Sequence, residues 1–329
     1  MKNKEKILNP YGPEGMCSYE YKLINGIKQY IQIRGEKRDN PILLFIHGGP
    51  GGALSGLSHV MQAEWEKHFT VVSFDQRNAG KTYVANKDKA FEIGKSGSVE
   101  DYLKDIDEIV EYLHSKLAFE KLYIMGFSWG SVIGAEYAKK YPGKVKAYIG
   151  VGQLISYENG FKYICKKIEE AAKEKGNKKD ADIAQKLIND YPSESIMTKD
   201  RMKNIRTFAT YANRYLVKHA KVFPLKAIIS SPFMNLEQKI AMFNSDIRLF
   251  DGTYKTMFSY EFKDNLKFDI PVCFITGEED VNCPGELVAE IMDSIDAPEK
   301  EYHRIPGASH MCFYDNAKEF EKIIFSYIR

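Results

Sequence analysis

The stretch "GFSWGS", residues 126–131, places a serine between two glycines at the end of an apolar run. The preceding "KLYIM" has the composition of a buried strand, and the following "WGSVIGAEYAKKYP" has the pattern of a helix. So sharp a strand-to-helix turn needs small residues, and it holds the hydroxyl of Ser128 at the carboxyl edge of a sheet. We therefore expect Ser128 to be a nucleophile rather than an ordinary turn residue.

Short apolar runs with the composition of parallel strands buried on both faces lie at 41–47, 69–75, 121–127, 145–152 and 268–276. Helical patterns separate most of these runs. Near the N-terminus, Asn25-Gly26 joins two alternating runs into a hairpin. The chain is thus predicted to have an α/β fold, with a mostly parallel central sheet flanked by helices.

Between residues 153 and 267 the alternation of strand and helix stops, and three long stretches have helical patterns without a convincing strand. We expect an α/β core formed by residues 1–152 and 268–329. Residues 153–267 are expected to be a helical cap inserted into that core.

Composition excludes several classes of partner. The chain has 47 basic and 45 acidic residues and no stripe of Lys and Arg near the motifs, so no nucleic-acid partner is expected. The N-terminal stretch is charged and broken by proline and glycine, and no later run approaches about 18 apolar residues. We therefore expect a cytoplasmic protein without a membrane partner. The cysteines form no C-x-x-C pair and no His/Cys cluster in the sequence, so neither a metal site nor a disulfide framework is expected; they are Cys17, Cys165, Cys273, Cys283 and Cys312.

A serine nucleophile needs a base, usually an imidazole, that is oriented by a carboxylate. On folds of this kind the acid follows the serine and the histidine follows the acid. Three histidines follow Ser128: His219 lies in the predicted helical insertion, His303 lies within the strand-like "EKEYHRI", and His310 lies in the loop after it. His310 is the predicted base.

For the acid, the apolar "VCFIT" runs into the loop "GEEDVNCP" at the same edge of the predicted sheet. Asp280 is the aspartate of this loop and precedes its turn residues, so it is the predicted carboxylate. Glu278 and Glu279 are alternatives for the same role.

The oxyanion of an acyl-transfer reaction needs two preorganised donors. "IHGGPGG", residues 46–52, follows the strand where such folds place one donor, and its glycines let the backbone approach a substrate closely. The predicted donors are the N–H groups of Gly49 and Trp129.

Five motifs occur in an order and at a spacing that resemble α/β-hydrolase fold enzymes of the proline iminopeptidase type, across nearly the whole chain: "HGGPGG" (47–52), "DQRNAGKT" (75–82), "GFSWGS" (126–131), "GEED" (277–280) and "GASH" (307–310). The resemblance implies the same nucleophile, acid, base and oxyanion donors as above. In "DQRNAGKT", Asn78 stands where glycine is usual in this branch, and Asp75 and Arg77 are expected to tie loops together.

The activity implied by the resemblance is release of an N-terminal residue, often proline, from a small molecule or short peptide, without a metal or an organic cofactor. In such enzymes carboxylates near the pocket hold the free ammonium of the substrate, since a buried cation needs a paired charge. Some relatives have a glutamate after the catalytic aspartate, where this chain has Val281. Glu158 and Gln153 are the expected substrate-binding residues, and the other candidate carboxylates are Glu169, Glu170, Glu194 and Glu237.

Two alternatives remain. The same three residues suit a carboxylesterase, thioesterase or lactonase. A non-catalytic ligand-binding protein on this fold is the other, and the presence of all three catalytic residue types disfavours it.

Overall fold

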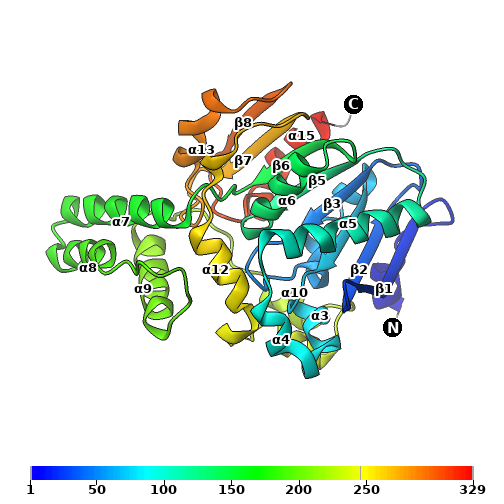
Figure 1. Cartoon of the computed structure of the whole chain (residues 1–329), viewed down its shortest axis with the longest axis horizontal. Helices are drawn as coiled ribbons and strands as arrows, with labels where there is room; N and C mark the ends of the chain where they lie inside the picture. The colour runs from blue at the N-terminus through cyan, green and yellow to red at the C-terminus, as the bar shows by residue number, and fades with distance from the viewer. Residues whose placement is uncertain (1, 245, 328–329) are drawn as a thin grey trace.

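A computed structural model of the chain describes residues 2–244 and 246–327. Its centre is one eight-stranded sheet in the order β1-β2-β4-β3-β5-β6-β7-β8 (Figure 1). The strands are β1 Met16–Ile24, β2 Ile27–Gly35, β3 Ile42–Ile46, β4 Thr70–Asp75, β5 Leu122–Phe127, β6 Val145–Val151, β7 Val272–Gly277 and β8 Lys300–Ile305. The β1–β2 and β2–β4 pairs are antiparallel, and the pairs from β4 to β8 are parallel. The predicted mostly parallel sheet is confirmed.

The predicted hairpin is also present. Asn25 and Gly26 join β1 to β2 with φ angles of 46° and 78°. Positive φ at both central residues gives a two-residue turn the twist of the flanking strands, and it is costly for most other residues.

Helices cover both faces of the sheet. They are α1 Lys2–Leu8, α2 Ser58–Met61, α3 Gly80–Ala85, α4 Ala90–Lys95, α5 Val99–Lys116, α6 Trp129–Lys140, α7 Tyr157–Glu174, α8 Lys178–Asn189, α9 Lys199–Tyr215, α10 Leu225–Ser230, α11 Leu236–Ala241, α12 Asp251–Ser259, α13 Gly285–Ile291, α14 Cys312–Asp315 and α15 Ala317–Ser326. None of the helices within the described residues is long and apolar enough to cross a membrane.

Alternation along the strands divides the core into two layers. In β3, Leu44 belongs to the apolar cluster that also holds side chains of α5, α6 and α13, whereas its neighbours Leu43 and Phe45 belong to the cluster on the other face, with Trp65 and side chains of α15. Successive side chains of a strand point to opposite faces, so a strand buried on both faces is apolar throughout. The two layers hold the strand ends in fixed positions.

The chain between β6 and β7 forms α7 to α12. Helices α7, α8 and α9 project away from the sheet (Figure 1) and pack around a small apolar core of their own that includes Phe161, Ile168 and Phe208. The chain then returns along the core, where the backbone N–H of Lys221 donates to the Asp315 carboxylate at 2.9 Å. Helix α12 follows before the chain enters β7.

Candidate active site

Ser128 lies on the turn between β5 and α6, with φ 54° and ψ −122°. This left-handed conformation is rare outside glycine and stores strain. The neighbouring positions have no room for a side chain. A Cβ on Gly130 would lie 2.1 Å from the Ile46 carbonyl oxygen, and one on Gly126 would lie 2.5 Å from the Gly130 carbonyl oxygen. The Ser128 N–H donates to the Val151 carbonyl at 2.9 Å. The turn is thus fixed by crowding and by a hydrogen bond to the next strand.

His310 and Asp280 form a close pair at the same edge of the sheet. The His310 Nδ1 lies 2.9 Å from each Asp280 carboxylate oxygen. Asp280 has a fully buried side chain, and its Oδ1 accepts the N–H groups of Asn282 and Cys283, each at 2.9 Å. These donors orient the carboxylate, and the carboxylate places the ring proton on Nδ1, which leaves Nε2 as an acceptor.

Close packing holds the His310 ring in place. The centroid of the Phe127 ring lies 4.8 Å from that of His310. On another side, a Cβ on Gly152 would lie 3.1 Å from Asp280 Oδ2 and 3.3 Å from His310 Cε1. A Cβ at Gly152 would force these groups to shift by a few tenths of an ångström, and the φ of 53° of Gly152 also favours glycine.

The alternative acids and bases lie in other surroundings. Glu279 accepts backbone N–H groups of Lys218 and His219 and contacts the His219 ring at 2.5 Å. Burial alone would raise the pKa of Glu279, but these donors lower it overall. Glu278 is exposed. His303 pairs with Glu301 on β8, at 2.8 Å. The structure brings His310 and Asp280 together and leaves these alternatives apart.

The loop after β3 lies against Ser128. A Cβ on Gly48 would lie 2.8 Å from the Ser128 Cβ, and Gly49 has a φ of 128°. His47 is buried and holds the base of this loop: its Nδ1 bonds the Gly48 carbonyl at 2.8 Å, and its Nε2 accepts the N–H of Gln76 at 3.1 Å. Burial lowers the pKa of His47, which suits a neutral ring that must accept this hydrogen bond. Trp129 is the first residue of α6, where N–H groups have no partner within the helix.

The "DQRNAGKT" segment ties loops together beneath this loop. Arg77 donates to both Asp105 carboxylate oxygens, at 2.9 and 2.8 Å. Asn78 has a φ of 58°, a conformation that Asn tolerates better than most residues, and its amide donates to the carbonyls of Ala90 and Leu249 at 2.7 Å each. Asn78 thus connects the core to the segment before α12.

A cavity of about 540 Å³ opens onto Ser128 and His310. Gly49 and Trp129 also line it, so the predicted nucleophile, base and oxyanion donors share one cavity. Its far wall is apolar and comes mainly from the segment between β6 and β7, with Leu154, Tyr157, Phe161, Met197, Ile205, Phe208, Phe223, Ile228, Met242, Phe243, Tyr254 and Met257. Among the described residues that line it there is no Asp, Glu, Lys or Arg.

The two predicted substrate-binding residues lie elsewhere, which corrects both expectations. Gln153 is 1% exposed; its amide oxygen accepts the Tyr148 hydroxyl at 2.6 Å, and its amide nitrogen donates to the Leu154 carbonyl at 3.2 Å. It is a core residue behind the cavity. Glu158 points outward from α7, with a side chain 44% exposed, and pairs with Lys162 one turn later. Its neighbour Tyr157 faces the cavity instead.

The other candidate carboxylates are also engaged away from the cavity. Glu169 pairs with Lys173, Glu170 with Lys167, and Glu237 with Lys87, whereas Glu194 is exposed. None of these side chains lines the cavity in the part of the chain that the structure describes.

Cys283 is a cavity residue that the sequence did not single out. It is buried and lines the cavity. Burial, and then the neighbouring Asp280 carboxylate, raise the pKa of its thiol well above the ordinary value. Its position three residues after Asp280 was the one sequence feature that could have indicated a place near the candidate site.

Comparisons with known proteins agree with this architecture. Residues 41–317 match the family model of the alpha/beta hydrolase fold. A probable aminopeptidase of Bacillus subtilis, YbaC, is 25% identical over 87% of this chain and 88% of its own length. The proline iminopeptidase of Lactobacillus delbrueckii subsp. lactis is 22% identical over 90% of this chain and 92% of its own length. These relatives confirm the resemblance to the proline iminopeptidase type.

Solved structures share the fold. Naproxen esterase (carboxylesterase NP) from Bacillus subtilis superposes with a TM-score of 0.62 at 14% identity, covering 100% of this chain and 95% of that one. A proline iminopeptidase-related protein from Thermus thermophilus superposes with a TM-score of 0.55 at 19% identity, covering 94% and 96%. The family match, the sheet topology and the sharp turn at Ser128 together show that the chain belongs to the α/β-hydrolase fold family.

Proposed function

We propose that the chain is a serine hydrolase in which Ser128 is the nucleophile, His310 the base and Asp280 the residue that orients the base. Three observations support these roles: the strained turn at Ser128, the 2.9 Å contacts between His310 and Asp280, and the opening of one cavity onto both Ser128 and His310. Strain of this kind is typical of functional sites.

In this proposal, Ser128 Oγ attacks the substrate carbonyl while His310 Nε2 accepts its proton, and Asp280 stabilises the imidazolium that forms. The N–H groups of Gly49 and Trp129 hold the developing oxyanion. His310 then protonates the leaving group. Water attacks the acyl-enzyme with His310 again as the base, and the acid is released.

We propose further that residues 153–267 act as a cap that shapes the acyl pocket. Tyr157, Phe161 and Phe208, which line the cavity, all lie in this segment. A cap of this kind would limit the reaction to small molecules and short peptides.

The substrate class that we propose follows from the absence of carboxylates in the described cavity wall. An ammonium group in this cavity would lose its hydration without gaining a paired charge, which is unfavourable in apolar surroundings. A volume of about 540 Å³ is within the usual range for small-molecule sites. The geometry therefore best supports hydrolysis of esters or thioesters of an apolar, uncharged acyl group.

A second candidate is an aminopeptidase that removes an apolar N-terminal residue. The names of the two sequence relatives favour it. Tyr157, Phe161 and Phe208 also line the cavity, and an aromatic ring can attract an ammonium group through a cation–π contact without a carboxylate.

The test compares two p-nitrophenyl esters that differ only by the α-ammonium: those of 3-phenylpropanoic acid and of phenylalanine. At pH 6 the amine of the second is charged, since α-amino groups titrate near pH 8. We expect at least a ten-fold higher kcat/KM for the uncharged ester. A higher value for the phenylalanine ester, with turnover of proline or alanine arylamides, would overturn the ester proposal in favour of the aminopeptidase.

A further inference from the structure

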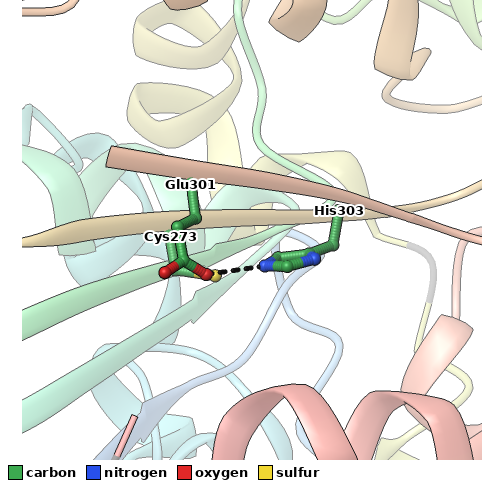
Figure 2. Close-up of side chains that lie close together, drawn as sticks. All are labelled: Cys273, Glu301 and His303. Carbon is green, nitrogen blue, oxygen red and sulfur yellow. Dashed lines mark hydrogen bonds and ion pairs between the residues drawn. The ribbon is translucent and has the colours of Figure 1, made fainter. Parts of the chain in front are cut away.

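Cys273, Glu301 and His303 lie close together on strands β7 and β8, away from the cavity (Figure 2). In the β7–β8 ladder Cys273 is opposite Glu301, and Ile275 is opposite His303. Because alternate residues of a strand share a face, these three side chains point to the same side of the sheet. Their sulfur, carboxylate oxygen and imidazole nitrogen all lie within 4.8 Å of one another, and within the described residues no second set of three such ligand atoms does so.

We propose that Cys273, Glu301 and His303 form a binding site for a zinc-class divalent cation. Thiolate, imidazole and carboxylate are the ligands that Zn²⁺ takes in proteins, and Co²⁺ and Cd²⁺ accept the same donors. Mg²⁺ and Ca²⁺ prefer oxygen ligands throughout. The cluster offers sulfur and nitrogen as two of its three donors, so it selects the first group of metals.

The spacing requires only a small adjustment to close around an ion. Tetrahedral Zn²⁺ with bonds of 2.0–2.3 Å separates its ligand atoms by about 3.3–3.8 Å. The Cys273 sulfur must therefore come closer to the other two ligand atoms by about 1.5 Å at most, and the His303–Glu301 pair, now 2.8 Å apart, must separate slightly. Cys273 is buried and fixed, whereas Glu301 and His303 have side chains 41% and 35% exposed on the terminal strand of the sheet and have room to move.

Charges around the cluster set the proton balance of binding. Burial, and then the neighbouring Glu301 carboxylate, raise the pKa of the Cys273 thiol, so the thiol keeps its proton when no cation is present. On binding, the S–H proton is released to solvent and a metal–sulfur bond forms. The bond between His303 Nε2 and Glu301 Oε2, 2.8 Å long, is replaced by bonds from both groups to the cation. A net release of protons makes affinity rise with pH.

Solvent reaches the cluster from the side of Glu301. A cavity of about 180 Å³ adjoins this residue and is also lined by Glu299, Lys146 and Tyr327. Glu299 and Lys146 carry charges of opposite sign, and of the three cluster residues Glu301 lines the cavity. A water molecule would complete the fourth position, as in zinc sites with three protein ligands.

The ion would connect two strands that lead to Asp280 and His310. Strand β7 ends at Gly277, three residues before Asp280, and β8 ends at Ile305, five residues before His310. Since β8 is the terminal strand of the sheet, a cross-link to β7 opposes its detachment. We expect the metal to stabilise the fold without taking part in acyl transfer, and this inference does not rest on the proposed function.

The test uses the metal-free full-length protein and Co²⁺ as a spectroscopic probe. Titration should produce a thiolate-to-cobalt charge-transfer band and the intense d–d bands of a tetrahedral site, and Zn²⁺ should displace both. Cys273→Ser should abolish the charge-transfer band, and His303→Gln should weaken Co²⁺ binding at least ten-fold. Cys17→Ser, on β1, is the matched control and should leave the spectrum unchanged.

His303→Gln keeps the buried cysteine, so it tests the site even if Cys273→Ser does not fold. A thermal scan adds a second measurement, since Zn²⁺ but not Mg²⁺ should raise the Tm of the wild-type protein and not that of His303→Gln. A Co²⁺ spectrum without a thiolate band, or one that is the same in His303→Gln, overturns the proposal.

Discussion

One wall of the 540 Å³ cavity comes from the turns after β3 and β5, and the opposite wall comes from the segment between β6 and β7, including helices α7, α9 and α12. In the first wall, backbone atoms are so close that added Cβ atoms on Gly48 and Gly130 would lie 2.8 Å and 2.1 Å from their neighbours. In the second wall, apolar side chains such as Phe208 and Met257 set the surface. Such crowding leaves the first wall little room to shift, which suits a reaction that needs precise positioning. The second defines only shape and polarity, so it should tolerate more change.

The largest expected effect is on the first wall. Ser128→Ala should lower kcat by roughly 10⁴-fold or more, because the proposed nucleophile is removed and only binding and the oxyanion donors remain. Labelling by a fluorophosphonate should disappear in the same variant. Ser115→Ala removes an exposed hydroxyl on α5 and should keep full activity and labelling. Activity of Ser128→Ala close to the wild type would refute the assignment.

Asp280→Asn should lower kcat by roughly 10³- to 10⁴-fold, since the amide no longer holds the His310 tautomer with Nδ1 protonated. Glu279→Gln is the matched change in the same loop. It should change kcat less than two-fold, because Glu279 bonds the segment at Lys218 and His219 rather than His310. Steady-state kinetics of both variants decide between the two carboxylates, and the reverse pattern would make Glu279 the acid.

Gly130→Ala tests how rigid the first wall is. Its Cβ would lie 2.1 Å from the Ile46 carbonyl oxygen, so the serine turn must shift, and we expect a loss of roughly 2–4 kcal/mol in the free energy of unfolding. Gly143→Ala is the control, since nothing lies within 4 Å of its added Cβ. Denaturant unfolding compares the two. Equal stability of both variants would mean that the turn is not crowded.

The same contrast explains what the sequence could predict. Backbone crowding requires particular residues, so "GFSWGS" and "HGGPGG" can be recognised from the sequence alone. Ser128 and Gly49, which these motifs single out, both line the cavity. A helix surface carries no such demand. Tyr157 and Glu158 are adjacent on α7, and about 100° of rotation separates their directions, so the residue that faces the cavity depends on how the helix packs. The sequence therefore located the region of the pocket wall but not its residues.

The expectation that Gln153 binds the substrate was wrong for a related reason. The end of β6 does lie beside Asp280 and His310, but the side chain of Gln153 turns back and accepts the Tyr148 hydroxyl at 2.6 Å. The spacing of Cys273, Glu301 and His303 along the chain gave no sign that they form a cluster. Its members become neighbours only through the register of β7 and β8, which the chain alone does not state.

The smallest effect, and the one that addresses the second wall directly, is a change in selectivity. Met197 is half-buried and lines the cavity, so Met197→Glu introduces a carboxylate where the described wall has none. The carboxylate pairs with the α-ammonium of a substrate, and partial exposure limits the desolvation cost. We expect the ratio of kcat/KM for the phenylalanine ester over the 3-phenylpropanoate ester to rise about ten-fold, which corresponds to about 1.4 kcal/mol.

Met197→Gln has nearly the same size and polarity without the charge, so it separates electrostatics from shape. It should leave the ratio within about two-fold of the wild type, which is below 0.5 kcal/mol. An equal rise in both variants would mean that polarity alone controls entry. A fall in kcat for both esters in Met197→Glu, with the ratio unchanged, would show that this wall also positions the reacting carbonyl. The assignment of positioning to the first wall and of shape and polarity to the second would then be wrong.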